Sequence, residues 1–216
     1  MTRQRNLFRI ASALFAVLFL VLIVLLRCVD VQPIGPEGSE VGLSALNGIV
    51  PATVGTHPFW YSLTELLGLL ALAVAACFGG LGLYQWIRRK RLLAVDRNIM
   101  LLAAIYGAVL FLYVLFELLV VNYRPILVDG ALEASFPSSH TMLALVVFGT
   151  AIPQILLRIR ARLPRILLVA LCALAMALTA VGRLLSGVHW FTDILGAILL
   201  SAALVFLYVA LLPRST

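Results

Sequence analysis

Six long apolar runs leave this chain few folds to choose from. They occupy residues 10–26, 62–86, 99–121, 141–157, 166–185 and 190–212. A helix needs about 20 apolar residues to cross the hydrocarbon layer of a bilayer, and each run reaches or nearly reaches that length. No alternating strand pattern competes with them. The chain is 12% charged, against roughly 25% in soluble domains. The sequence therefore predicts an all-α fold, a bundle of six transmembrane helices.

The length of the chain leaves no room for a second domain. Six spans of about 20 residues each use most of the 216 positions, so we expect residues 1–216 to form a single membrane domain. The first run follows three arginines, as a signal peptide would, but no small-residue cleavage site comes after it. We expect it to be retained as a span.

The basic residues indicate the orientation of the bundle. If the N-terminus is cytoplasmic, only Arg27, Arg124 and Arg183 of the 16 basic residues lie outside, and the other thirteen, Arg214 included, lie inside. Cytoplasmic loops carry an excess of Lys and Arg, so the pattern predicts that both termini lie on the cytoplasmic side of the plasma membrane. This topology explains the net charge of +7 without a nucleic-acid partner. The Gly- and Pro-rich outer loop at 27–61 is expected to lie over the outer mouth of the bundle.

Polar residues that the topology does not explain gather at the outer ends of spans three to six. They are Glu117, Asn122, Arg124, Ser138, Ser139, His140, Arg183, His189 and Asp193. Ionisable groups at membrane depth are costly and are functional candidates by default. We therefore expect a functional site within residues 117–193, on the periplasmic or extracellular face.

His189 and Asp193 stand four residues apart at the start of the last run. On one helical face, the carboxylate can accept the proton of one ring nitrogen and leave the other nitrogen free to attack. Taken alone, such a pair is more often a structural hydrogen bond between buried polar groups, and it indicates a function only weakly.

Pro137-Ser138-Ser139-His140 precedes the fourth run. Ser138 or Ser139 is expected at a helix N-cap, where outward N–H groups and the positive helix end favour phosphate oxygens. The alternative is an ordinary capped helix with His140 at the interface.

Two guanidinium groups, those of Arg124 and Arg183, can clamp phosphoryl oxygens, although either arginine could instead reach a lipid headgroup.

Taken together, these segments resemble the type-2 phosphatidic acid phosphatase superfamily of membrane lipid phosphatases. The family pattern is Lys, six residues and Arg-Pro, then Pro-Ser-Gly-His, then Ser-Arg, five residues, His, three residues and Asp. The corresponding residues are Glu117, Arg124-Pro125, Pro137-Ser138-Ser139-His140, Gly182-Arg183, His189 and Asp193. Order and spacing agree throughout.

The resemblance implies a role for each matching residue. His189 would be the nucleophile, Asp193 its orienting acid, and His140 the general acid and base. The phosphate would be held by Arg124, Ser139, Arg183 and, at the same helix start, Ser138. Because arginines and helix-end N–H groups supply the charge stabilisation, we expect neither a metal ion nor a cofactor.

Three positions depart from the family pattern. Ser139 replaces glycine and Gly182 replaces serine, both small changes. Glu117 replaces the lysine and puts a carboxylate where a cation is usual, about two helical turns from Arg124 and on its face. We predict a salt bridge by which Glu117 aims Arg124 or Arg183; the alternative is that Glu117 supports helix packing only.

The expected function is hydrolysis of a lipid phosphate or diphosphate through a phosphohistidine. Undecaprenyl diphosphate or another polyprenyl diphosphate, phosphatidic acid and phosphatidylglycerol phosphate all fit. A phosphotransferase that passes the phosphoryl group to an acceptor is one alternative, and a non-catalytic lipid-binding or transport protein with a decayed site is the other. The partners expected are the lipid substrate and the bilayer, and the sequence leaves open whether the chain forms a homo-oligomer.

Overall fold

The computed structural model describes residues 2–213, with the side chains of all of these except residues 2 and 50–54. Within that range the chain forms seven α-helices and no β-strand. They are α1 (Thr2–Cys28), α2 (Ser44–Val54), α3 (Pro58–Arg89), α4 (Arg97–Leu118), α5 (Ser139–Arg158), α6 (Arg162–Leu185) and α7 (Phe191–Leu211). All but α2 are long and apolar enough to cross a membrane. The prediction of an all-α, six-span, multi-pass membrane protein is confirmed; Arg214 lies outside the described residues.

Two helix ends differ from the apolar runs that predicted them. Helix α4 ends at Leu118, although its apolar run continues to residue 121. Helix α7 begins at Phe191, with Trp190 as its N-cap, one residue later than its run. Hydropathy indicates which residues can lie within the membrane, whereas backbone hydrogen bonds at the caps decide where a helix stops. Arg124 and His189 consequently lie in loops and not on helices.

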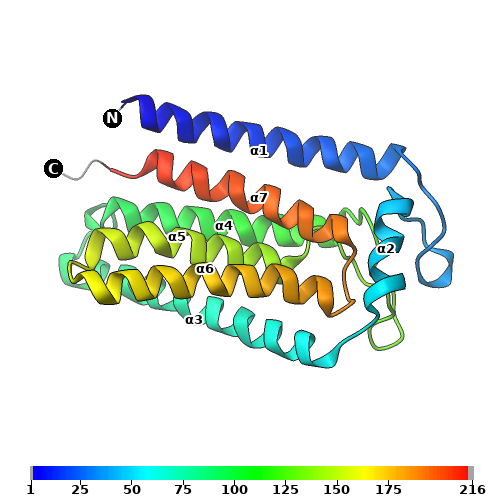
Figure 1. Ribbon diagram of the computed structural model, residues 1–216. Helices are drawn as coiled ribbons and strands as arrows, with labels where there is room; N and C mark the ends of the chain where they lie inside the picture. The colour runs from blue at the N-terminus through cyan, green and yellow to red at the C-terminus, as the bar shows by residue number, and fades with distance from the viewer. Residues whose placement is uncertain (1, 214–216) are drawn as a thin grey trace.

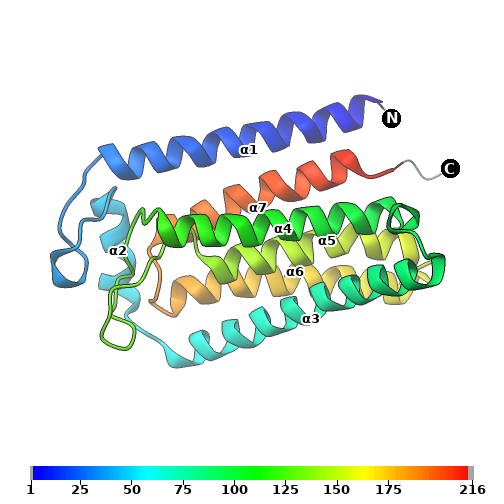
Figure 2. The ribbon, with the colours of Figure 1, turned by 180° about the vertical axis from the view of Figure 1, so that it is seen from behind.

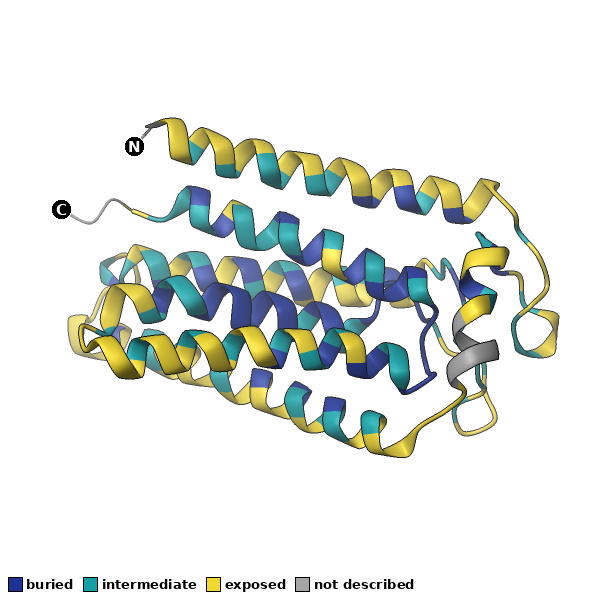
Figure 3. Ribbon diagram, in the orientation of Figure 1, coloured by how far each residue is buried: buried dark blue, intermediate teal, exposed yellow. Residues whose placement is uncertain are grey.

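Helix α5 is the centre of the bundle. It contacts α3, α4, α6 and α7, while α1 lies at the edge and packs mainly on α7. Figures 1 and 2 show this arrangement from two sides, and in Figure 3 α5 carries the densest run of buried residues. Its small residues, including Ala144, Gly149 and Ala151, allow neighbouring helices to approach α5 closely on several faces.

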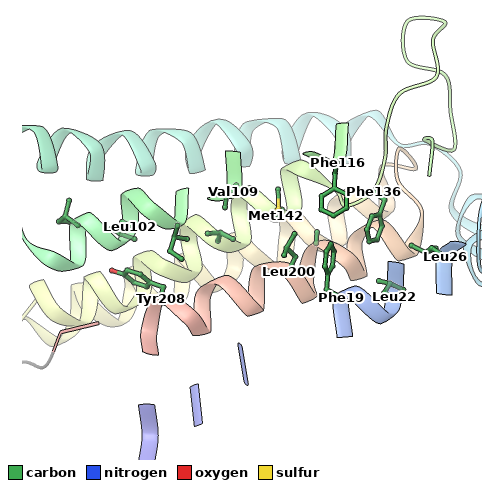
Figure 4. Close-up of a cluster of buried hydrophobic side chains, with 14 of the residues drawn as sticks. Phe19, Leu22, Leu26, Leu102, Val109, Phe116, Phe136, Met142, Leu200 and Tyr208 are labelled. Carbon is green, nitrogen blue, oxygen red and sulfur yellow. The ribbon is translucent and has the colours of Figure 1, made fainter. Parts of the chain in front are cut away.

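An aromatic cluster joins the outermost span to the middle of the bundle (Figure 4). Phe19 of α1 lies 5.7 Å from Phe136, and Phe116 of α4 lies 5.9 Å from Phe136, between ring centroids. Edge-to-face and stacked pairs of this kind each contribute about 0.5–1.5 kcal/mol beyond burial. The cluster thereby fixes the chain at residue 136, just before α5.

The start of α1 and the end of α7 lie at one end of the bundle, which we call the terminal end (Figure 1). Arg5 near the start of α1 donates a hydrogen bond to the carbonyl of Leu212 after α7. An even number of spans requires this arrangement. Which side of the membrane the terminal end faces stays a prediction.

Helix α2 lies across the opposite end of the bundle, the α2 end (Figure 2). Asn47 is fully buried there. Its Nδ2 donates to Thr192 Oγ1 at 3.0 Å, and its Oδ1 accepts from the Thr192 N–H at 3.1 Å. The segment at 27–61 thus folds over this end of the bundle and is tied to the first turn of α7; that this end is the outer one stays a prediction.

Candidate active site

The predicted site residues converge at the α2 end of the bundle. They come from the loop after α4, the first turn of α5, the last turn of α6 and the start of α7. Arg124, Ser139 and His189 line one small hollow. Arg124 and Arg183 are electrostatic neighbours of both His140 and His189.

His189 and Asp193 are almost completely buried and face each other at 3.5 Å between Nδ1 and Oδ2. They are not an i, i+4 pair on a helical face, as the spacing predicted, because His189 precedes the helix. A third residue joins them instead. The hydroxyl of Ser135 lies 3.0 Å from His189 Nδ1 and donates a hydrogen bond to Asp193 Oδ2.

This chain of contacts sets the tautomer of His189. Since the Ser135 proton goes to Asp193, the Ser135 oxygen can only accept, and Nδ1 must carry the ring proton. Nε2 then bears the lone pair, and it is buried with no hydrogen-bond partner in the described structure. Burial lowers the pKa of His189 to about 4, although the nearby Asp193 carboxylate opposes the shift. A neutral imidazole with a free Nε2 is the form that can act as a nucleophile.

Local helix capping explains why Asp193 is held in place. It is the third residue of α7, and its Oδ2 accepts the N–H of the N-cap residue Trp190 at 2.8 Å. An acid at this position satisfies an N–H that has no partner within the helix and interacts favourably with the helix dipole.

Arg124 lies on one arm of a small hairpin that connects α4 to α5. Its N–H bonds the Glu133 carbonyl at 3.0 Å, and its Nε lies 3.2 Å from Glu133 Oε2. Ser135 sits on the other arm, where its N–H bonds the Asn122 carbonyl at 3.0 Å. The hairpin therefore positions both Arg124, a candidate phosphate-binding residue, and the Ser135 hydroxyl at the site.

Arg183 is 1% exposed and sits in the last turn of α6. Its Nη2 donates to Glu65 Oε1 of α3 at 2.9 Å, and its guanidinium carbon lies 5.2 Å from the centre of the Tyr61 ring. Its Nε and Nη1 have no partner in the described structure. Two donor nitrogens are thus left for a ligand.

The preceding Gly182 has a steric reason to differ from the serine of the family pattern. A Cβ at position 182 would lie 2.7 Å from Thr64 Cγ2 of α3, a distance at which something must shift. Glycine therefore lets α3 approach α6 closely.

The two serines at the start of α5 have different surroundings. Ser138 is the N-cap residue and is fully buried, and its hydroxyl contacts Thr141 Oγ1 at 3.0 Å. Ser139 lines the hollow with His189 and Arg124. N–H groups in the first turn of a helix have no acceptor within it, so this helix start can offer them to an anion.

His140 lies beside an apolar groove between α3, α4 and α5, which it lines together with Ser139. Its Nε2 is 3.1 Å from Glu65 Oε1, the oxygen that also accepts from Arg183. Its Nδ1 is buried and has no partner in the described structure.

The predicted salt bridge of Glu117 is wrong. Glu117 is exposed in the last turn of α4 and lines the hollow. Among the described residues, however, the acids paired with Arg124 and Arg183 are Glu133 and Glu65. The prediction assumed that α4 continued to Arg124, whereas the chain leaves the helix at Leu118 and turns into the hairpin.

Three site residues were missed from the sequence. Glu65 had a readable signal, since it is the one charged residue between Pro58 and Ile87 in an apolar run. Ser135 and Glu133 had none, because a serine and a glutamate are ordinary residues in a loop between two spans. Among the described residues, no group of three or more His, Cys, Asp or Glu side chains is placed to hold a metal ion.

Comparisons with known proteins bear on the same region. The family model of the PAP2 superfamily matches residues 104–216. A solved structure of similar fold is the transmembrane PAP2 type phosphatidylglycerolphosphate phosphatase from Bacillus subtilis, with a TM-score of 0.65 and 20% sequence identity. The match covers 92% of this chain and 94% of that one. The search of curated proteins found no match.

Proposed function

Because the chain belongs to the PAP2 superfamily, we propose that it hydrolyses the phosphate ester or diphosphate of a membrane lipid. The observation that carries the proposal is the free Nε2 of His189, backed through Nδ1 by Ser135 and Asp193. Two arginines and a helix start lie beside it. An activated ring nitrogen next to donors for a tetrahedral anion is the combination that phosphoryl transfer needs.

In the first step, Nε2 of His189 attacks phosphorus as the bond from phosphorus to the lipid oxygen breaks. The leaving oxygen takes its proton from protonated His140. For a diphosphate substrate the leaving group is the lipid monophosphate. Asp193, acting through Ser135, stabilises the positive charge that develops on His189.

In the second step, His140 takes a proton from water as the water oxygen attacks phosphorus. The bond between nitrogen and phosphorus breaks, inorganic phosphate leaves, and both histidines return to their starting state. Arg124, Arg183 and the N–H groups at the start of α5 stabilise the charge on the phosphoryl oxygens in both steps. We expect no metal requirement for this reason.

The groove between α3, α4 and α5 supports a lipid as the substrate. It is lined mainly by apolar side chains, such as Leu72, Val109 and Val147, and it reaches Ser139 and His140. An acyl or prenyl tail can lie there while its phosphate reaches the arginines. Phosphatidic acid, phosphatidylglycerol phosphate and polyprenyl diphosphate are the substrate classes to compare. We place the active site on the periplasmic or extracellular face of the membrane as part of the same proposal.

The test is phosphate release by the purified protein from these three lipids. We expect turnover of at least one of them with EDTA present. His189→Ala should lower it by about 10³-fold or more, because nucleophile removal in comparable enzymes has effects of that size. Acid-labile label from a ³²P-lipid should be found on the quenched wild-type protein and not on the variant.

The matched control is His57→Ala, which changes a histidine that the mechanism does not use. It should keep the wild-type rate within about twofold, as most substitutions away from buried networks do. Lipid binding without phosphate release would contradict the proposal and support a non-catalytic protein. Transfer of the label to an added acceptor in place of water would support a phosphotransferase.

A further inference from the structure

We propose that Glu65 of α3 is a positioning residue that holds the His140 ring and the Arg183 guanidinium in place for the reaction proposed above. The inference rests on that reaction. It concerns a helix that lies before the residues matched by the PAP2 family model, 104–216.

The location of Glu65 already points to a partner. It is the one charged side chain between Pro58 and Ile87 of an apolar span, and acids at membrane depth are costly unless they are paired. Arg183, which it pairs with, is 1% exposed. Removing Glu65 would leave the buried charge of Arg183 without its partner.

A single carboxylate oxygen connects the two groups. Oε1 of Glu65 accepts from Arg183 Nη2 at 2.9 Å and lies 3.1 Å from His140 Nε2. Outer carboxylates that accept from a functional histidine fix its ring orientation and tautomer. With Nε2 paired in this way, Nδ1 is the nitrogen of His140 left to exchange a proton with substrate.

The contacts of Glu65 leave the phosphate-binding donors free. Nε and Nη1 of Arg183 and Nδ1 of His140 are all without a partner in the described structure. A bound phosphate therefore does not need to displace Glu65. This favours a positioning residue over a carboxylate that merely occupies the anion site until the substrate arrives.

The rest of the same face of α3 is shaped around these two groups. Tyr61, Glu65 and Gly68 follow the i, i+4, i+7 spacing of one helical face. The Tyr61 ring lies under the Arg183 guanidinium, a cation–π contact. A Cβ at position 68 would lie 3.0 Å from His140 Cδ2, so glycine there leaves room for the ring.

The decisive experiment compares Glu65→Gln with wild type across pH. We expect kcat to fall by about 10- to 100-fold, the usual cost of losing such an outer partner, with a smaller change in KM. A carboxylate oxygen 3.1 Å from Nε2 stabilises the protonated His140 that donates to the leaving group, whereas the positive charges of Arg183 on α6 and Arg124 on the hairpin disfavour it. Without the carboxylate, the basic limb of the kcat profile should move to lower pH. A purely structural residue would not move that limb.

A double-mutant cycle tests whether Glu65 acts through His140. In a His140→Ala background, Glu65→Gln should lower the residual rate by a smaller factor than it lowers the wild-type rate, because only its contact with Arg183 is then left to lose. Glu40→Gln, which changes an exposed acid of the outer loop, is the matched control and should behave as wild type.

Each remaining outcome decides the inference. Wild-type kcat and pH profile in Glu65→Gln would overturn it, and so would faster turnover with tighter orthovanadate binding, which would mark Glu65 as an occupant of the anion site. If Glu65→Gln does not elute as a folded species, Glu65→Asp replaces it. Asp is one methylene too short to reach both partners, so an unchanged profile there would also overturn the inference. A wild-type protein that releases no phosphate would refute the proposed function instead.

Discussion

Burial determines which protonation state His189 holds at neutral pH. The ring is 1% exposed, and the loss of hydration lowers its pKa to about 4 even though Asp193 favours the charged form. The unprotonated ring is the reactive one. Protonation as the pH falls through the pKa of the folded protein removes the lone pair on Nε2.

The acid limb of kcat/KM should therefore lie far below the value of an ordinary histidine, whose pKa is about 6.5. Activity should persist as the pH falls through 6.5 and should be lost only on approaching about 4. The measurement is kcat/KM from pH 3.5 to 8, with circular dichroism at each pH to separate titration from unfolding. An acid limb near pH 6.5 in the folded protein would mean that His189 is not buried as the structure has it.

Helix α7 is positioned against the site loop by one glycine. A Cβ at Gly196 would lie 2.4 Å from Cε2 and 2.6 Å from Cζ of Phe136. The Phe136 ring cannot move aside easily, because Phe19 and Phe116 pack on it. Close contact of α7 with this loop is what keeps Ser135 within reach of Asp193.

Gly196→Ala should therefore destabilise the protein by about 1–3 kcal/mol, the usual cost of overpacking a filled core, and lower the midpoint of thermal unfolding in detergent. Gly107→Ala is the matched control, since a Cβ there has no neighbour within 4 Å. Equal midpoints for the two variants would show that the aromatic cluster yields more readily than its packing indicates.

The candidate site and the terminal end, as defined by the start of α1 and the end of α7, lie at opposite ends of the bundle. The charge pattern of the sequence predicts that the terminal end is cytoplasmic. Cys28 offers a native probe of this prediction, because it is exposed at the α2 end of α1. Cys77 and Cys172 lie within spans α3 and α6.

A membrane-impermeant maleimide should label Cys28 in right-side-out vesicles and should not label it in sealed inside-out vesicles. Arg160→Cys, in the short loop between α5 and α6, should show the opposite pattern when introduced into Cys28→Ser. Labelling of Cys28 only in inside-out vesicles would place the site on the cytoplasmic face and reverse the proposed orientation.

Much of the fold and part of the site follow from the sequence alone. Hydropathy over about 20 residues is a local property that sets the number of spans, and all six were predicted. The polar residues of the motifs had no topological explanation, so their convergence was also predictable. Arg124, Ser139 and His189 do line one hollow.

Only the tertiary structure decided which groups pair with these residues. Glu117 looked like the partner of an arginine because the sequence is apolar up to residue 121, but a cap ends α4 at Leu118. Ser135 reaches Asp193 through a hairpin that no local pattern announces. Glu65 reaches Arg183 and His140 because glycines let α3 pack closely on α5 and α6. Contacts between distant segments depend on how side chains fit together in space, which local periodicity does not encode.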